Sequence, residues 1–87
     1  MAREFVTRRA FDRSFKRLPK HIQADAIEKF ARFLDDPSHP SLRVKRVKGT
    51  EDIWEMSVTM NYSVTFEVEE ERLILRRIGT HDILRHP

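Results

Sequence analysis

The sequence has no cysteine, only two glycines and four prolines among 87 residues. Without cysteine it has no disulfide framework and no thiolate metal site. Its two glycines, Gly49 and Gly79, are too few for a glycine-rich loop that cradles a phosphate. A domain this small and without covalent staples is expected to rely on compact packing or on a partner.

Long hydrophobic runs are also missing. No apolar stretch approaches the roughly 20 residues of a membrane span, and the N-terminus lacks the apolar block of a signal peptide. Hydrophobic residues make up 39% of the chain, which is enough for one small core. The sequence therefore predicts a single domain over residues 1–87 that is soluble, cytoplasmic and not bound to a membrane.

Charged residues, in contrast, are abundant and segregated. Seventeen Lys and Arg residues against 14 Asp and Glu residues give a formal net charge of +3. Basic residues concentrate between Arg43 and Lys48 and near the C-terminus, whereas glutamates concentrate between Glu67 and Glu71. Such segregation suits a phosphate backbone or an acidic protein partner. On charge alone, a solvated charged surface explains the pattern equally well.

The first half of the chain predicts a strand and two helices. Residues 4–7 suit an edge strand. Apolar residues then recur at helical spacing from Arg8 to Pro19, with Thr7 as N-cap, and again over residues 20–34. These apolar positions are Phe11, Phe15, Leu18, Ile22, Ala26, Ile27, Phe30, Phe33 and Leu34. The short connection makes the helices an antiparallel hairpin, and its phenylalanines are expected in the core rather than as a base-stacking platform.

The second half alternates apolar and polar residues, which predicts strands. Four runs have this pattern: residues 42–47, 54–60, 62–68 and 73–78, with Gly79 ending the last. Residues 80–87 would then form an irregular tail. An N-terminal edge strand, a helical hairpin and about four further strands predict an α+β fold, with the helices on one face of a mostly antiparallel sheet.

The opposite face of this sheet is expected to be open and basic, with His81 at its rim. Lysines and arginines there would bind phosphates, and histidine is the side chain best suited to proton exchange near neutral pH. A metal-free ribonuclease needs such a set, because one group accepts the 2′-hydroxyl proton, a cation stabilises the phosphate and another group protonates the leaving oxygen. The residues expected on this face are Arg43, Lys45, Lys48, Ser57, Ser63, Arg77 and His81.

The C-terminal residues allow two other interpretations. His81 would, as a structural turn histidine, form a hydrogen bond with Asp82. A metal site using His81, Asp82 and His86 is disfavoured, because these residues lack regular ligand spacing. No metal and no other cofactor is therefore expected.

The chain carries, in order, a helical hairpin, Lys48 with Gly49, Trp54, Asn61 with Tyr62, and the closing segment IGTHDIL at residues 78–84. This succession resembles the RelE/ParE superfamily of bacterial toxins over nearly the whole chain, and the closing segment is most similar to RelE and YafQ. The resemblance implies a RelE-like fold and a ribosome-dependent mRNA endoribonuclease that inhibits translation. It also implies a cognate antitoxin that wraps the toxin and blocks it in a hetero-oligomer.

The resemblance also suggests site residues. Lys48 falls where a basic residue precedes the glycine in RelE-type sequences. His81 matches a histidine of YafQ-like members and an arginine in RelE, and Arg85 or His86 stands near a late catalytic position. Arg77 is added from the charge pattern alone. The expected catalytic residues are His81, Lys48, Arg77 and Arg85, and the expected RNA-binding residues are Arg43, Lys45, Arg46, Lys48, Arg76 and His86.

Three positions depart from the family pattern. Many relatives carry a basic residue where this chain has Ser57 and Ser63, and RelE has a lysine where it has Glu55. Removing a phosphate-binding cation weakens stabilisation of the transition state. Two alternatives therefore stay open: a ParE-like protein that inhibits DNA gyrase without catalysis, and an attenuated homologue that only binds its antitoxin.

Overall fold

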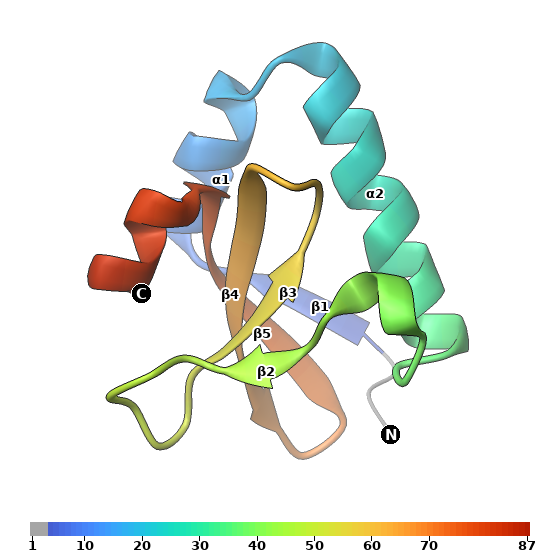
Figure 1. Ribbon diagram of the computed structural model, residues 1–87, viewed down its shortest axis with the longest axis vertical. Helices are drawn as coiled ribbons and strands as arrows, with labels where there is room; N and C mark the ends of the chain where they lie inside the picture. The colour runs from blue at the N-terminus through green and yellow to red at the C-terminus, as the bar shows by residue number, and fades with distance from the viewer. Residues whose placement is uncertain (1–3) are drawn as a thin grey trace.

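Five strands form one sheet in the computed structural model, which describes residues 4–87. The elements in chain order are β1 (Glu4–Thr7), α1 (Arg9–Arg17), α2 (Lys20–Asp35), the 3₁₀ helix η1 (Pro40–Leu42), β2 (Lys45–Arg46), β3 (Trp54–Ser57), β4 (Tyr62–Glu69), β5 (Arg72–Thr80) and the 3₁₀ helix η2 (His81–Arg85). The strand order is β1-β5-β4-β3-β2 (Figure 1). Only β1 and β5 run parallel. The predicted α+β fold with an N-terminal edge strand is confirmed.

The two helices form an inverted V (Figure 1), and their apolar sides build the core against one face of the sheet. Phe11 of α1 and Phe33 of α2 are buried, and the Phe33 ring meets the Phe66 ring of β4 at 5.7 Å between centroids. The Phe5 and Phe30 rings are 5.2 Å apart. A nine-residue helix such as α1 is marginal alone, so this packing stabilises it. The phenylalanines are core residues, as predicted.

The start of α1 differs from the prediction. The N-cap is Arg8, which makes no side-chain capping bond, so the prediction of Thr7 as N-cap is wrong. The reason is that Thr7 still belongs to β1, where it pairs with Leu75, and the Arg8 amide donates to the Leu75 carbonyl at 3.1 Å. The break at Pro19 lies where the sequence placed it, since Pro19 is the N-cap of α2.

Two strand ends were also predicted incorrectly. β3 stops at Ser57, because the amides of Val58 and Thr59 both donate to the Tyr62 carbonyl and close a tight turn. This turn leaves Met60 89% exposed instead of on the core face. β5 continues through Gly79 to Thr80 because both residues still pair with β4.

A shift of register between β4 and β5 decides which side of the sheet the basic residues of β5 occupy. Thr65 faces Arg77, but the next residue of β4 faces Leu75, which leaves Arg76 as the extra residue of a β-bulge. The bulge allows Leu75 and Ile78, three positions apart, both to be buried. Arg76 and Arg77 are therefore both kept out of the core.

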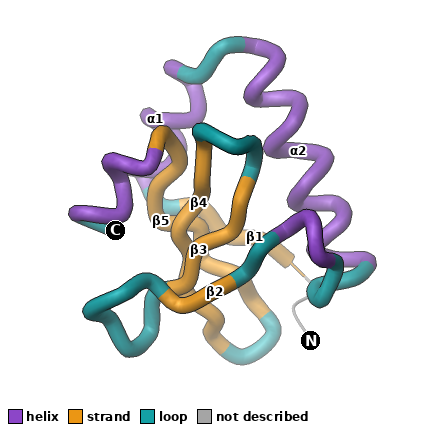
Figure 2. The backbone as a smooth tube through the Cα atoms, viewed as in Figure 1, coloured by secondary structure: helices purple, strands orange, loops and turns teal. Residues whose placement is uncertain are grey.

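The C-terminal residues are not an irregular tail. Residues 81–85 form η2, which follows β5 without a loop (Figure 2) and contacts both β4 and β5. The Thr65 hydroxyl donates to the Pro87 backbone oxygen at 3.2 Å, and Thr65 is 0% exposed. The polar face of the sheet is therefore covered in its centre rather than open throughout. Within residues 4–87, no helix is both long and apolar enough to cross a membrane.

Candidate active site

A hollow of about 410 Å³ lies on the uncovered part of the polar face. We call it the His81 hollow, and its lining residues are Arg43, Val44, Lys45, Glu55, Ser57, Met60, Ser63 and His81. The loop after η1, the strands β2 to β4 and the start of η2 all contribute to it. The structure thus brings together five of the seven residues that the sequence placed on this face, while Lys48 and Arg77 lie elsewhere.

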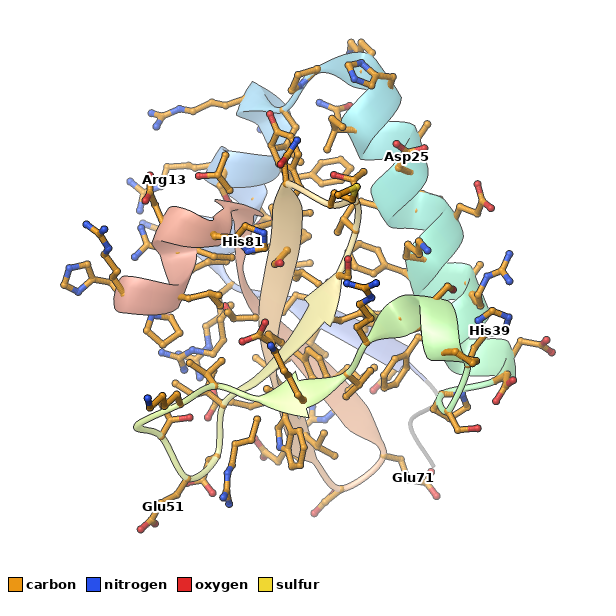
Figure 3. The ribbon with its side chains drawn as sticks, viewed as in Figure 1. Arg13, Asp25, His39, Glu51, Glu71 and His81 are labelled. Atoms are coloured by element: carbon orange, nitrogen blue, oxygen red, sulfur yellow. The ribbon has the colours of Figure 1, made fainter. Side chains whose placement is uncertain are left out.

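His81 stands at the rim of this hollow as the first residue of η2, with its ring beside the upper end of β4 (Figure 3). Its Nε2 lies 2.9 Å from the Met60 carbonyl oxygen. A carbonyl oxygen can only accept, so Nε2 carries the hydrogen and the neutral ring has its acceptor lone pair on Nδ1. Within the described chain His81 forms no hydrogen bond with Asp82, so the turn-histidine interpretation is not supported.

The close approach of η2 to the sheet depends on Gly79. A Cβ atom at this position would lie 3.1 Å from Cγ2 of Ile83, tighter than ordinary van der Waals contact. Because Ile83 belongs to the same turn of helix as His81, the missing side chain of Gly79 helps to set the position of the imidazole.

Glu55 provides the hollow with a carboxylate. It pairs with Lys45 across β3 and β2, and Lys45 Nζ lies 3.9 Å from Glu55 Oε1. The Glu55 side chain is only 12% exposed, whereas that of Lys45 is 71% exposed. From the sequence, Glu55 stands out only as a departure from the family pattern. The strand alternation that places Glu55 on the same face as Ser57 was the signal that identifies it as a site residue.

Arg43 lines the hollow and has an uncommon backbone conformation. It caps η1 with φ 49° and ψ 47°, in the left-handed region that glycine usually occupies. The preceding residue, Leu42, is completely buried and fixes this corner of the chain. The arginine therefore projects from an anchored position.

Three other predicted residues do not line the His81 hollow. Lys48 and Arg46 line an adjacent hollow of about 350 Å³, which shares Lys45 and Glu55 with the first. Arg85 is exposed in the last turn of η2. The structure therefore separates these three cations from the group that surrounds His81.

The remaining predicted residues form a separate group. Arg76, Arg77 and His86 line a hollow of about 320 Å³ that shares no residue with the His81 hollow. Arg76 already has partners: its Nη1 lies 2.6 Å from Glu67 Oε2, and its Nε donates to the Pro87 backbone oxygen at 3.0 Å. Arg76 therefore holds the C-terminal segment in place. Among residues 4–87, no group of three His, Asp or Glu side chains is arranged to hold a metal ion.

No protein-family model and no curated protein matches this chain. Solved structures do match, among them a chain of the RelB–RelE antitoxin–toxin complex from Methanococcus jannaschii. The TM-score is 0.74 at 22% identity, covering 93% of this chain and 95% of that chain. The YoeB/ParE toxin from Agrobacterium tumefaciens matches with a TM-score of 0.76 at 13% identity, covering 91% and 99%.

A chain of the E. coli DinJ–YafQ toxin–antitoxin complex is similar as well. Its TM-score is 0.72 at 15% identity, and the match covers 97% of this chain and 98% of that chain. At such identities the likeness concerns the fold. The chain therefore shares its fold with these structures, and the RelE-like fold that the sequence predicted is confirmed.

Proposed function

We propose that this chain is the toxin of a type II toxin–antitoxin system and that it cleaves mRNA on the ribosome. The observation that carries the proposal is the His81 hollow, where an imidazole, a carboxylate and two cations surround one space of about 410 Å³. These groups are the ones that metal-free cleavage of RNA requires. The similar folds of toxins from RelB–RelE and DinJ–YafQ complexes add support.

In the proposed reaction Glu55 accepts the proton of a 2′-hydroxyl of the RNA. The 2′-oxygen then attacks the adjacent phosphorus and the bond from phosphorus to the 5′-oxygen breaks. Protonated His81 donates its Nδ1 proton to this leaving oxygen, while Nε2–H stays bonded to Met60. The products are a 2′,3′-cyclic phosphate and a 5′-hydroxyl.

Arg43 and Lys45 would stabilise the charge that develops on the phosphate during this step. With Ser57 and Ser63 in the lining, the hollow holds no further lysine or arginine. We therefore expect slow cleavage of free RNA and a strong dependence on the ribosome to position the mRNA, because positioning alone lowers a barrier by several kcal/mol. A ribosomal target would place the chain in the cytoplasm.

A cognate antitoxin is the expected partner, in a hetero-oligomeric complex. The RelB–RelE and DinJ–YafQ structures are antitoxin–toxin complexes, which supports a similar assembly. The net charge of +3 favours an acidic antitoxin segment across the basic surface. Co-expression would be expected to suppress growth inhibition and yield a stable complex.

Sequencing of transcript 5′ ends after induction tests the proposal. We expect new ends within translated codons, and we expect them to disappear in the variant His81→Gln. Intact mRNA in the wild-type strain, with growth inhibited and DNA supercoiling altered, would overturn it.

Binding to DNA gyrase in the manner of ParE is the second candidate function. The observation that favours it is the carboxylate of Glu55, 12% exposed, where an RNA phosphate would approach. This candidate predicts full growth inhibition by His81→Gln and loss of gyrase supercoiling activity in vitro. An attenuated homologue, in contrast, would inhibit neither process and would still bind its antitoxin.

A further inference from the structure

Three arginines converge on the outer side of α1 and β5. Arg13 and Arg17, one helical turn apart on α1, and Arg77 of β5 line a hollow of about 160 Å³ with Ala10 and Ser14. We call these three residues the arginine cluster. It shares no lining residue with the His81 hollow, and Figure 3 shows Arg13 projecting outward from α1.

All the charged side chains that line the cluster are positive. Within residues 4–87, none of its three arginines forms an ion pair, and Arg77 only donates from Nη1 to the His86 carbonyl at 3.0 Å. The acidic residue of α1, Asp12, does not line the hollow. Three unpaired guanidinium groups around one small space raise the local positive potential, and a bound anion would relieve their repulsion.

Ser14 holds the two elements of the cluster together. Its hydroxyl donates within α1 to the Ala10 or Phe11 carbonyl at 3.0 Å and accepts from the Ile78 amide of β5 at 3.4 Å. That amide faces α1 because the pairing of β1 with β5 ends at Leu75. The backbones that carry the arginines are therefore fixed before a ligand arrives, which reduces the entropy lost on binding.

We propose that the arginine cluster binds the phosphate backbone of a nucleic acid, at a site separate from the His81 hollow. Guanidinium groups bind phosphate oxygens through two parallel hydrogen bonds. The cluster contains no aromatic or large aliphatic side chain, whereas protein–protein interfaces have an apolar core enriched in aromatic residues. These features favour a nucleic-acid backbone over an acidic protein. The inference does not require that His81 is catalytic.

Binding of short labelled nucleic acids, measured by fluorescence anisotropy at several salt concentrations, tests the proposal. All proteins carry His81→Gln so that RNA stays intact. The test variant combines Arg13→Gln, Arg17→Gln and Arg77→Gln, and the matched control combines Lys20→Gln, Lys29→Gln and Arg72→Gln. Both lose three positive charges, and thermal melting verifies that both are folded.

If the cluster binds the backbone, the test variant loses affinity about 10-fold or more for duplex RNA. Its slope of log affinity against log salt also becomes shallower by about 2 to 3, whereas the control changes by less than about 1. Parallel probes of duplex RNA, duplex DNA and single-stranded RNA identify which backbone is bound. Equal losses in the test variant and the control would overturn the proposal.

Two further measurements test an acidic protein partner and cover the case in which the triple variant does not fold. A polyglutamate peptide that binds more tightly than any nucleic acid, and loses this binding only in the test variant, would overturn the proposal in favour of an acidic protein partner. Should the triple variant unfold, each single variant is measured instead, and each is expected to reduce the salt slope by about 1.

Discussion

The His81 hollow and the arginine cluster are both basic, but they differ in what surrounds their cations. In the hollow, Lys45 lies beside Glu55 and both face His81 across the same space. In the cluster, arginines face only arginines and uncharged residues. Arginine stays protonated in proteins, so the cluster can hold an anion but cannot transfer a proton. The hollow combines an imidazole and a carboxylate with its cations, so it can both bind an anion and transfer a proton.

The two regions also differ in how they are built. The arginine cluster lies where a regular helix, α1, meets a regular strand, β5, and the hydroxyl of Ser14 links these two elements. The hollow is assembled from a strained cap, short strands, a tight turn and a 3₁₀ helix. We therefore expect substitutions to affect the hollow through geometry and the cluster mainly through charge.

The largest expected effect comes from His81→Gln. Loss of a general acid lowers a rate about 100-fold to 10,000-fold, and the exposed side chain contributes little to stability. Single-turnover cleavage of mRNA on programmed ribosomes measures the effect. His21→Gln on α2, another exposed histidine, serves as the control and is expected to keep the wild-type rate.

Glu55→Gln separates two roles for the carboxylate in the hollow. If Glu55 is the base, the same assay shows a loss of about 100-fold, because the amide cannot accept the 2′-hydroxyl proton. If the carboxylate only repels RNA, the variant instead cleaves faster. Nucleic-acid binding by the arginine cluster is expected to stay unchanged in either case.

Gly79→Ala tests whether η2 positions the imidazole. The added methyl group would press on Ile83 and displace η2 by a few tenths of an ångström. We expect cleavage to fall about 3-fold to 10-fold, because small displacements of catalytic groups are costly. Unchanged cleavage in a folded variant would show that the hollow tolerates this shift. The salt dependence of nucleic-acid binding is not expected to change.

Ser14→Ala is the mildest probe and acts on the other region. It removes the acceptor for the Ile78 amide, and the free energy of unfolding should fall by about 1 kcal/mol in urea denaturation. The link between α1 and β5 loosens, so binding of duplex RNA is expected to weaken about 2-fold. Cleavage on the ribosome should stay at the wild-type rate. Ser38→Ala, in an exposed turn, is the control.

Sequence periodicity was sufficient to predict most of the fold. Phe11 and Phe33 were assigned to the core from spacing alone, and they are buried. Spacing could not reveal the bulge beside Arg76, because a register shift depends on how two strands pair and not on either strand alone. Arg77 does pair with Thr65 on the polar face, but the C-terminal residues that bond to both side chains separate it from the His81 hollow.

The site was harder to predict than the fold. His81 was identified by its chemistry and by the closing motif, whereas Glu55 was overlooked because charge counting favoured the basic residues. The alternation of β3 placed it beside Ser57, but whether that face stayed open depended on η2. Residues 80–87 show no regular pattern, so the cover that they provide over Thr65 could be seen only in three dimensions.

Arg43 connects the proposed cleavage of mRNA to the stability of the fold. A side chain in the left-handed conformation costs about 1 kcal/mol relative to glycine, so Arg43→Gly is expected to raise the midpoint of thermal unfolding. The same change removes one of the two permanent cations of the hollow and should slow cleavage. If cleavage depends on Arg43, a selection for thermostability at this position would enrich variants that cleave mRNA more slowly.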